Sequence, residues 1–154
     1  MANFTVQSNL AVSPAAFWAA TDMRSVNWEL RPLVRMTTPK GWETGRSLDQ
    51  WKVGQTLFKS WILLFGVLPV DLHAFKLREI QPDVGFQECS SSWMNKEWNH
   101  SRRTAPLPEG CSVTDHVSIV GRFPLVTALL LPVYRLVFEH RHRRLRSKYP
   151  NASA

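Results

Sequence analysis

The sequence predicts an α+β fold in which a run of short strands is followed by one long C-terminal helix. From Val34 to Phe123, short segments rich in Val, Ile, Phe and Trp alternate with glycine and proline, as in an antiparallel meander. After Pro124 the apolar residues recur with a helical period instead. At 154 residues the chain has the usual size of one domain, so we expect a single domain over residues 1–154.

The first strand and the first helix are predicted from the N-terminal residues. Phe4, Val6 and Leu10 fall on one side of an alternating segment, which is typical of a half-buried strand. Ser13 and Pro14 follow, and serine is a favoured N-cap while proline is favoured at the first helical position. A short helix is therefore expected over SPAAFWAATD.

The second short helix is predicted over SVNWELRPL. Ser25 is its candidate N-cap, and the helix should stop near Arg31 because Pro32 disfavours the helical conformation of the residue before it. The following segment, PKGWETGRSLDQWKVG, fits either a loop or a ragged hairpin.

The last helix should run from Pro124 to about Tyr149 and bend at Pro132, which removes a backbone donor. Its two faces differ in polarity. The predicted apolar face holds Val126, Leu129, Leu130, Val133, Val137 and Leu145, and the predicted polar face holds Arg135, Glu139, His142, Arg143 and Arg146.

The composition and the motifs of the chain argue against several kinds of site. The two cysteines, Cys89 and Cys111, lie outside any CxxC or Cys/His cluster, so neither a disulfide framework nor a metal site is expected and a reducing cytoplasm is the expected compartment. No phosphate-binding glycine loop and no nucleophile elbow is present, and we expect no cofactor. No basic and apolar leader is evident at the N-terminus, and the apolar runs are too short to span a bilayer.

The formal net charge of +7 comes largely from the end of the chain. Such a basic segment can contact nucleic acid or an anionic membrane, although a solvated helix face whose cations favour the helix C-terminus is the simpler interpretation. No motif for specific nucleic-acid recognition accompanies it. The basic residues of this segment are Arg135, Arg141, Arg143, Arg144, Arg146 and Lys148, against the single acid Glu139.

The strongest candidate for a polar site lies in WNHSRR and CSVTDHVSIV. If residues 106–110 form a hairpin turn, positions summing to about 215 pair, which sets His100 opposite Asp115. An aspartate on an apolar face needs a partner, and His100 or Arg102 would supply one. The same arrangement suits a general base oriented by a carboxylate and a purely structural ion pair, and we favour the structural interpretation.

The element order, together with EWNHSRR, GCSVTDHVSIVGR and a terminal helix ending VFEHRHRRLRSKY, resembles the START-like or SRPBCC superfamily. That superfamily includes polyketide cyclase/dehydrase-like proteins, lipid-transfer domains and the birch-pollen-allergen type. The resemblance implies a helix-grip fold, in which a curved antiparallel sheet of six to seven strands wraps around the C-terminal helix and leaves a ligand cavity between them.

This resemblance favours noncatalytic binding or transport of a small hydrophobic ligand such as a lipid, a polyketide or an aromatic metabolite. The first alternative is a polyketide cyclase or dehydratase in which His100 moves a proton, Asp115 orients His100 and Arg102 assists. The second is an adaptor that contacts a membrane surface or nucleic acid through the arginine-rich end. A monomer or a homodimer is expected, with at most transient membrane contact. The candidate ligand-binding residues are Trp28, Trp61, Phe65, Phe75, Leu77, Trp98, His100, Asp115, Val117, Leu130, Val133 and Val137.

Overall fold

The computed structural model describes residues 1–42 and 48–150, and in this part of the chain a seven-stranded antiparallel sheet is combined with three α-helices. The strands are β1 (Ala2–Leu10), β2 (Val34–Met36), β3 (Thr56–Leu64), β4 (Leu68–Gln81), β5 (Gly85–Ser92), β6 (Asn95–Leu107) and β7 (Gly110–Gly121). The helices are α1 (Pro14–Ala19), α2 (Met23–Leu30), the 3-10 helix η1 (Leu48–Gln50) and α3 (Pro124–Lys148).

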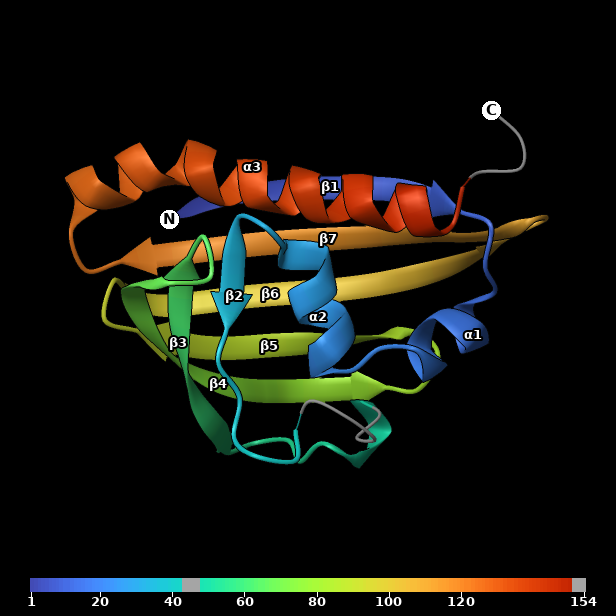
Figure 1. Ribbon diagram of the computed structural model, residues 1–154, viewed down its shortest axis with the longest axis horizontal. Helices are drawn as coiled ribbons and strands as arrows, with labels where there is room; N and C mark the ends of the chain where they lie inside the picture. Colours follow the sequence, from blue (N-terminus) through green and yellow to red (C-terminus); the bar gives the residue numbers. More distant parts are fainter. Residues whose placement is uncertain (43–47, 151–154) are drawn as a thin grey trace.

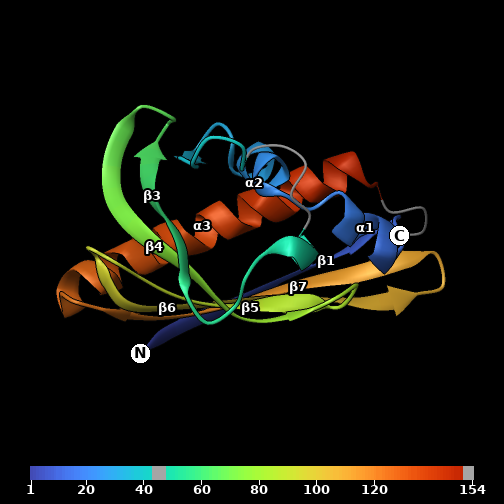
Figure 2. The same ribbon diagram turned by 90° about the horizontal axis from the view of Figure 1, so that it is seen from below.

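The sheet has the strand order β1-β7-β6-β5-β4-β3-β2, so the first strand pairs with the last one (Figure 1). β3 and β4 curl out of the plane of β5, β6 and β7 toward the side on which α2 and α3 lie (Figure 2). This is the curved sheet around a long C-terminal helix that the family resemblance implies, and the helix-grip fold is therefore confirmed.

The two short helices form where predicted, but one cap differs. The Ser13 side chain accepts a hydrogen bond from the backbone N–H of Ala16 at 3.2 Å, as expected for an N-cap. In α2 the predicted cap Ser25 is wrong, because Asp22 caps the helix. Asp22 Oδ1 accepts the Ser25 backbone N–H at 2.8 Å, and the Ser25 hydroxyl accepts the Asp22 N–H at 3.0 Å, which makes a capping box. The helix ends at Leu30 with Arg31 as its C-cap, close to the predicted stop before Pro32.

The segment predicted as a loop or a ragged hairpin lies partly outside the described residues. Its described part contains the 3-10 helix η1. Leu48 and Trp51 are buried there, and Trp51 packs against Phe75 of β4 with ring centroids 5.8 Å apart. This segment therefore contributes apolar side chains to the core.

The core consists of two apolar clusters with charged residues between them. The larger cluster joins α1, α2, η1, β3, β4 and the end of α3, and includes Phe17, Trp18 and Leu145. The smaller cluster joins β1, β7 and the middle of α3, and is centred on Phe4 and Phe138, whose rings lie 5.4 Å apart. Buried charged groups need paired partners, so this boundary is where a polar site is expected.

The predicted apolar face of the last helix is only partly correct: Leu145 is buried and Leu130 and Val137 are half-buried, but Val126, Leu129 and Val133 are exposed. The described side chains of α3 that are buried are Phe138, Arg141, His142 and Leu145, whereas Leu129 is 77% exposed. His142 was predicted on the solvated face and is fully buried. It can be buried because both of its ring nitrogens are hydrogen-bonded: the Asp115 carboxylate accepts from Nε2, and the Ser8 hydroxyl bonds to Nδ1.

Candidate functional site

The hairpin β6–β7 carries the predicted pair of residues, with a register that differs from the predicted one. Leu107 pairs with Gly110 across a two-residue turn, so paired positions sum to 217 rather than 215. Arg102 is therefore opposite Asp115, and His100 is opposite Val117. Because the difference is two residues, every side chain keeps its face of the sheet, and His100, Arg102 and Asp115 all point into the interior.

Asp115 is the centre of a buried cluster of charged groups. Arg102 donates to it twice, from Nε to Oδ1 at 2.8 Å and from Nη2 to Oδ2 at 2.7 Å. Nε2 of His100 lies 2.9 Å from Oδ1, and Nε2 of His142 lies 2.9 Å from Oδ2. Burial alone raises the pKa of Asp115, but the Arg102 charge and hydrogen bonds, followed by those of His100, hold the pKa well below its usual range.

Glu88 extends this cluster along the inner face of the sheet. Its Oε1 lies 2.7 Å from Nε2 of His73 and accepts the Ser90 hydroxyl at 2.6 Å, and its Oε2 lies 3.3 Å from Nδ1 of His100. Burial raises the pKa of Glu88, yet the hydrogen bonds and charges of His100 and His73 lower it to about 2. Glu88 is thus a carboxylate across the ordinary pH range.

Three members of the cluster come from helices, Glu29 from α2 and Arg141 and His142 from α3, and the sequence did not predict their contacts with it. Glu29 on α2 accepts from Nη1 of Arg102 at 3.0 Å and from Nε of Arg141 at 3.0 Å. Arg141 on α3 is buried by this contact, which joins both helices to the sheet. Glu29 lies 73 residues from Arg102 and 112 residues from Arg141, so no local pattern indicates the contact.

The cluster balances its charges when His100 is protonated. Three carboxylates, Glu29, Glu88 and Asp115, face the two guanidinium groups of Arg102 and Arg141, which leaves one negative charge. Burial lowers the pKa of His100, but the charges and hydrogen bonds of Asp115 and Glu88 outweigh burial and raise it. A proton on His100 would offset the negative charge that these five groups leave.

This geometry does not favour His100 as a general base. Both of its ring nitrogens face carboxylate oxygens, and its side chain is buried among Phe86 and Phe138, whose ring centroids lie 5.2 and 5.0 Å from its own. A base must reach its substrate within hydrogen-bond distance and must have a nitrogen free to take a proton. The arrangement instead ties β5, β6 and β7 to α2 and α3.

The basic end of α3 also makes contacts inside the molecule. Arg146 donates from Nη1 to the Ser8 hydroxyl at 2.7 Å, and Arg144 lies over the Trp28 ring with its Cζ 4.1 Å from the centroid. Arg141 pairs with Glu29 as described above. The face predicted as simply solvated is thus partly built into the fold.

The predicted ligand-binding residues lie in different parts of the structure. Trp28 is covered by Arg144, Trp61 contacts Trp93 at a centroid distance of 4.9 Å, and Trp98 contacts Tyr134 at 5.3 Å. Their role in ligand binding stays a prediction. Those buried in the core or in the charged cluster are Phe75, Leu77, His100, Asp115 and Val117, and those partly or fully exposed are Trp28, Trp61, Phe65, Trp98, Leu130, Val133 and Val137.

A surface pocket of about 430 Å³ lies elsewhere, between α1 and the turn that joins β4 to β5. Six of its eight lining residues are apolar, and Gln81 and Asp83 provide polar groups at the turn. Trp18 donates its Nε1–H to the Thr104 hydroxyl at 2.9 Å, so its hydrogen-bonding capacity is already used inside the protein. The lining residues are Ala15, Trp18, Ala19, Leu48, Ile80, Gln81, Pro82 and Asp83, none of which was predicted to bind ligand.

Two further observations concern metal and membrane. Among the residues that the structure describes, no group of three or more His, Cys, Asp or Glu side chains is arranged to hold a metal ion. Within the same residues, no helix combines the length and the apolar character needed to cross a bilayer.

Comparison with known proteins supports the fold. A family model described as "Domain of unknown function (DUF8410)" matches residues 8–149. No curated protein matches the sequence. Several solved structures are similar, among them a START superfamily protein from Mycobacterium smegmatis, with a TM-score of 0.65, 10% identity and 96% of each chain covered.

Two other similar structures are Ara h 8.0201 and DynU16. Ara h 8.0201 has a TM-score of 0.56 and 13% identity over 95% of this chain and 98% of its own. DynU16, from the dynemicin biosynthetic locus, has a TM-score of 0.56 and 12% identity over 96% of this chain, which spans 48% of DynU16. At these identities the likeness shows a common START-like fold, as the sequence resemblance implies.

Proposed function

The chain belongs to the DUF8410 family, and we propose that it binds a small, largely apolar ligand without changing it chemically. The observation that carries the proposal is the pocket of about 430 Å³ between α1 and the β4–β5 turn. Its size is within the range of about 300–1,000 Å³ that is usual for small-molecule sites, and an apolar lining with few polar groups is typical of them.

The lining indicates the kind of ligand. Ala15 and Ala19 are small, so the side of the pocket formed by α1 is open, and Leu48, Ile80 and Pro82 offer apolar contact. Gln81 and the exposed Asp83 lie at the turn, where they can bind a hydroxyl, an amine or another donor at one end of the ligand. A flat or aliphatic metabolite with one polar end fits this description.

The charged cluster supports binding rather than catalysis. His100 and Asp115 already bond to each other and to Glu88 and Arg102. The cluster instead makes the scaffold rigid, which favours binding because less motion is lost when the ligand is held. We further propose that residues 1–154 act as one ligand-binding domain in a reducing compartment, since Cys89 and Cys111 are both free thiols.

Titration with the uncharged fluorescent apolar dye Nile red tests the proposed pocket. Ala19→Trp places a large ring in the pocket, whereas Ala16→Trp puts the same ring on an exposed position of the same helix outside the lining. We expect Ala19→Trp to weaken dye binding by about tenfold or more, and Ala16→Trp to leave it unchanged. Equal binding by wild type and Ala19→Trp would contradict this location.

Extraction of the purified protein with organic solvent, followed by mass spectrometry, would identify a bound metabolite. The same metabolite should be depleted in Ala19→Trp and retained in Ala16→Trp. Its retention by both variants would place the binding site elsewhere.

A further inference from the structure

We propose that one end of the molecule docks on an anionic lipid surface. Three connections meet at this end: the turn between β3 and β4, the turn between β5 and β6, and the junction of β7 with α3. They do so because neighbouring strands are antiparallel, which brings every second connection to the same end of the sheet. We call this surface the apolar end.

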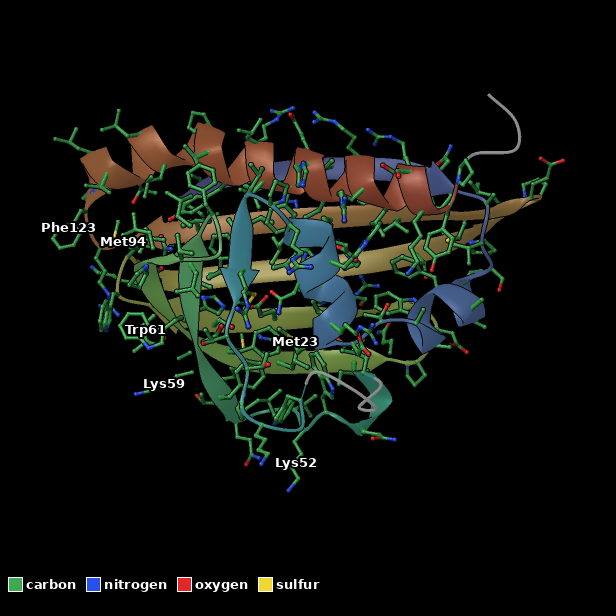
Figure 3. All side chains as sticks on the ribbon, viewed as in Figure 1. Met23, Lys52, Lys59, Trp61, Met94 and Phe123 are labelled. Carbon is green, nitrogen blue, oxygen red and sulfur yellow. The ribbon has the colours of Figure 1, made fainter. Side chains whose placement is uncertain are left out.

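Each of these three connections exposes large apolar side chains. Val67 is 78% exposed in the β3–β4 turn, Trp93 is 59% exposed in the β5–β6 turn, and Leu125 is 82% exposed in the first turn of α3. Trp61, Met94 and Phe123 project from the same edge (Figure 3). Single exposed apolar residues are ordinary, but several that come from separate elements and gather at one end indicate an interaction surface.

The β3–β4 turn illustrates the cost of this arrangement. Phe65 has a φ of 53°, a left-handed conformation that bulky side chains rarely adopt, and it is still 66% exposed. Within the described residues, the Phe65 ring makes no contact with another ring that would stabilise this conformation. An asparagine or a glycine would form the same turn more easily, so the aromatic ring is better explained by a contact outside the chain.

The charges around the apolar end have the sign that an anionic surface needs. Residues 60–70, 89–95 and 123–134 contain no charged side chain. The charges that border these segments and face solvent are cationic, namely Lys59, Lys96, Arg122 and Arg135, with Glu139 paired to Arg135. The bordering acids Asp71 and Glu88 are buried, and Glu97 is the exposed acid next to Lys96. Cations around an apolar centre match the headgroup layer of an anionic membrane.

The shape and the tryptophans favour lipid over a second protein molecule. The apolar groups stand on three separate projecting connections, which suits insertion into a fluid interface better than a flat contact between two rigid surfaces. At this end Trp61 and Trp93 contact each other edge to face, with ring centroids 4.9 Å apart. Tryptophan is favoured at the interface of a membrane with water, where its ring is apolar and its N–H meets the headgroups.

Docking at the apolar end would leave the pocket accessible. The pocket is lined by residues 80–83 at the far end of β4, and β4 begins at the apolar end with Leu68. The two proposals therefore rest on opposite ends of the same strand, and each can fail without the other.

The test is co-sedimentation of the full chain with vesicles made of equal parts phosphatidylcholine and phosphatidylserine. Leu125→Glu/Leu129→Glu changes two exposed residues of α3 and should fold normally, as circular dichroism would verify. The matched control is Val53→Glu/Leu107→Glu, which adds the same charges on exposed apolar residues away from the apolar end. We expect the α3 variant to lose at least about tenfold in vesicle binding and the control to bind like wild type.

Charge and oligomeric state provide further arms of the test. Lys59→Glu/Lys96→Glu should weaken binding to the anionic vesicles, and vesicles of phosphatidylcholine alone should bind wild type more weakly. Equal binding by wild type and the α3 variant would overturn the proposal. Sedimentation velocity tests for a second copy of the chain instead of lipid. If wild type is a dimer, the α3 variant is a monomer and neither binds vesicles, the proposal would be overturned in favour of dimerisation through this surface. Loss of vesicle binding with unchanged dye binding would separate this surface from the pocket.

Discussion

Replacing Asp115 by asparagine removes the carboxylate to which Arg102, His100 and His142 all bond. Asparagine has almost the same size, so the change acts through charge and hydrogen bonding. The guanidinium of Arg102 is left buried with Glu29 as its remaining carboxylate, and breaking one partner of a buried pair costs about 3–5 kcal/mol. That is a large part of a total stability of about 5–15 kcal/mol.

Urea denaturation at neutral pH measures this loss. With a slope of about 2 kcal/mol per M of urea, the unfolding midpoint should fall by roughly 1.5–2.5 M. Asp83→Asn is the matched control, because Asp83 is exposed and its carboxylate takes no part in the cluster. We expect it to change the unfolding free energy by less than about 0.5 kcal/mol. A loss below about 1 kcal/mol for Asp115→Asn would refute the view that Asp115 holds the cluster together.

The pH dependence of the stability of Asp115→Asn provides a second test. The pKa of His100 is raised in the folded protein, so its contribution to stability is complete below pH 6.5, the ordinary value, and is lost as the pH rises through the folded pKa. Asp115→Asn removes the main cause of the raised pKa. The difference in stability between wild type and variant should therefore be larger at slightly acidic pH than at alkaline pH, and a constant difference would exclude this coupling.

Two more predictions concern wild-type behaviour in acid and one backbone position. Glu88 has a pKa of about 2 in the folded protein against an ordinary 4.5, so its contribution to stability is present above pH 4.5 and is lost as the pH falls toward 2. The urea midpoint should therefore decrease between pH 4.5 and pH 2. A midpoint that does not change with pH in this range would contradict the contacts assigned to Glu88. Gly110→Ala should lower the free energy of unfolding by about 1–3 kcal/mol more than Gly54→Ala, as measured by thermal or urea unfolding. A Cβ at Gly110 would lie 1.9 Å from the Leu10 carbonyl oxygen, whereas a Cβ at Gly54 meets nothing within 4 Å. Both glycines have positive φ, so equal losses would show that the close approach is unimportant.

Local sequence patterns predict most of the elements in this protein because their causes are local. Alternation of apolar residues in β1, the Ser13 cap before Pro14 and the helical period after Pro124 each act within a few residues. The errors have local reasons as well. A reciprocal capping box moved the N-cap of α2 from Ser25 to Asp22, and a two-residue turn moved the β6–β7 register by two.

The candidate site was only partly predictable. Sequence reasoning brought His100, Arg102 and Asp115 to one face of a hairpin, because alternation along a strand is independent of a two-residue error in register. It could not find Glu29, Arg141 or His142, which reach the cluster from helices. It expected the ligand between the sheet and α3, which stays a prediction, and it gave no indication of the surface pocket of about 430 Å³ beside α1.

The sequence by itself determined the order of the elements and the inward face of β6 and β7, since these follow from short-range periodicity and from the solvation of side chains, whereas the START-like fold class came from the family resemblance. Only the tertiary structure decided which face of α3 is buried. A helical period marks apolar positions, but Arg141 and His142 can replace them in the interior when Glu29 and Asp115 compensate their charge and hydrogen-bonding groups. With this face of α3 turned inward, Leu125 and Leu129 are exposed to solvent at the apolar end.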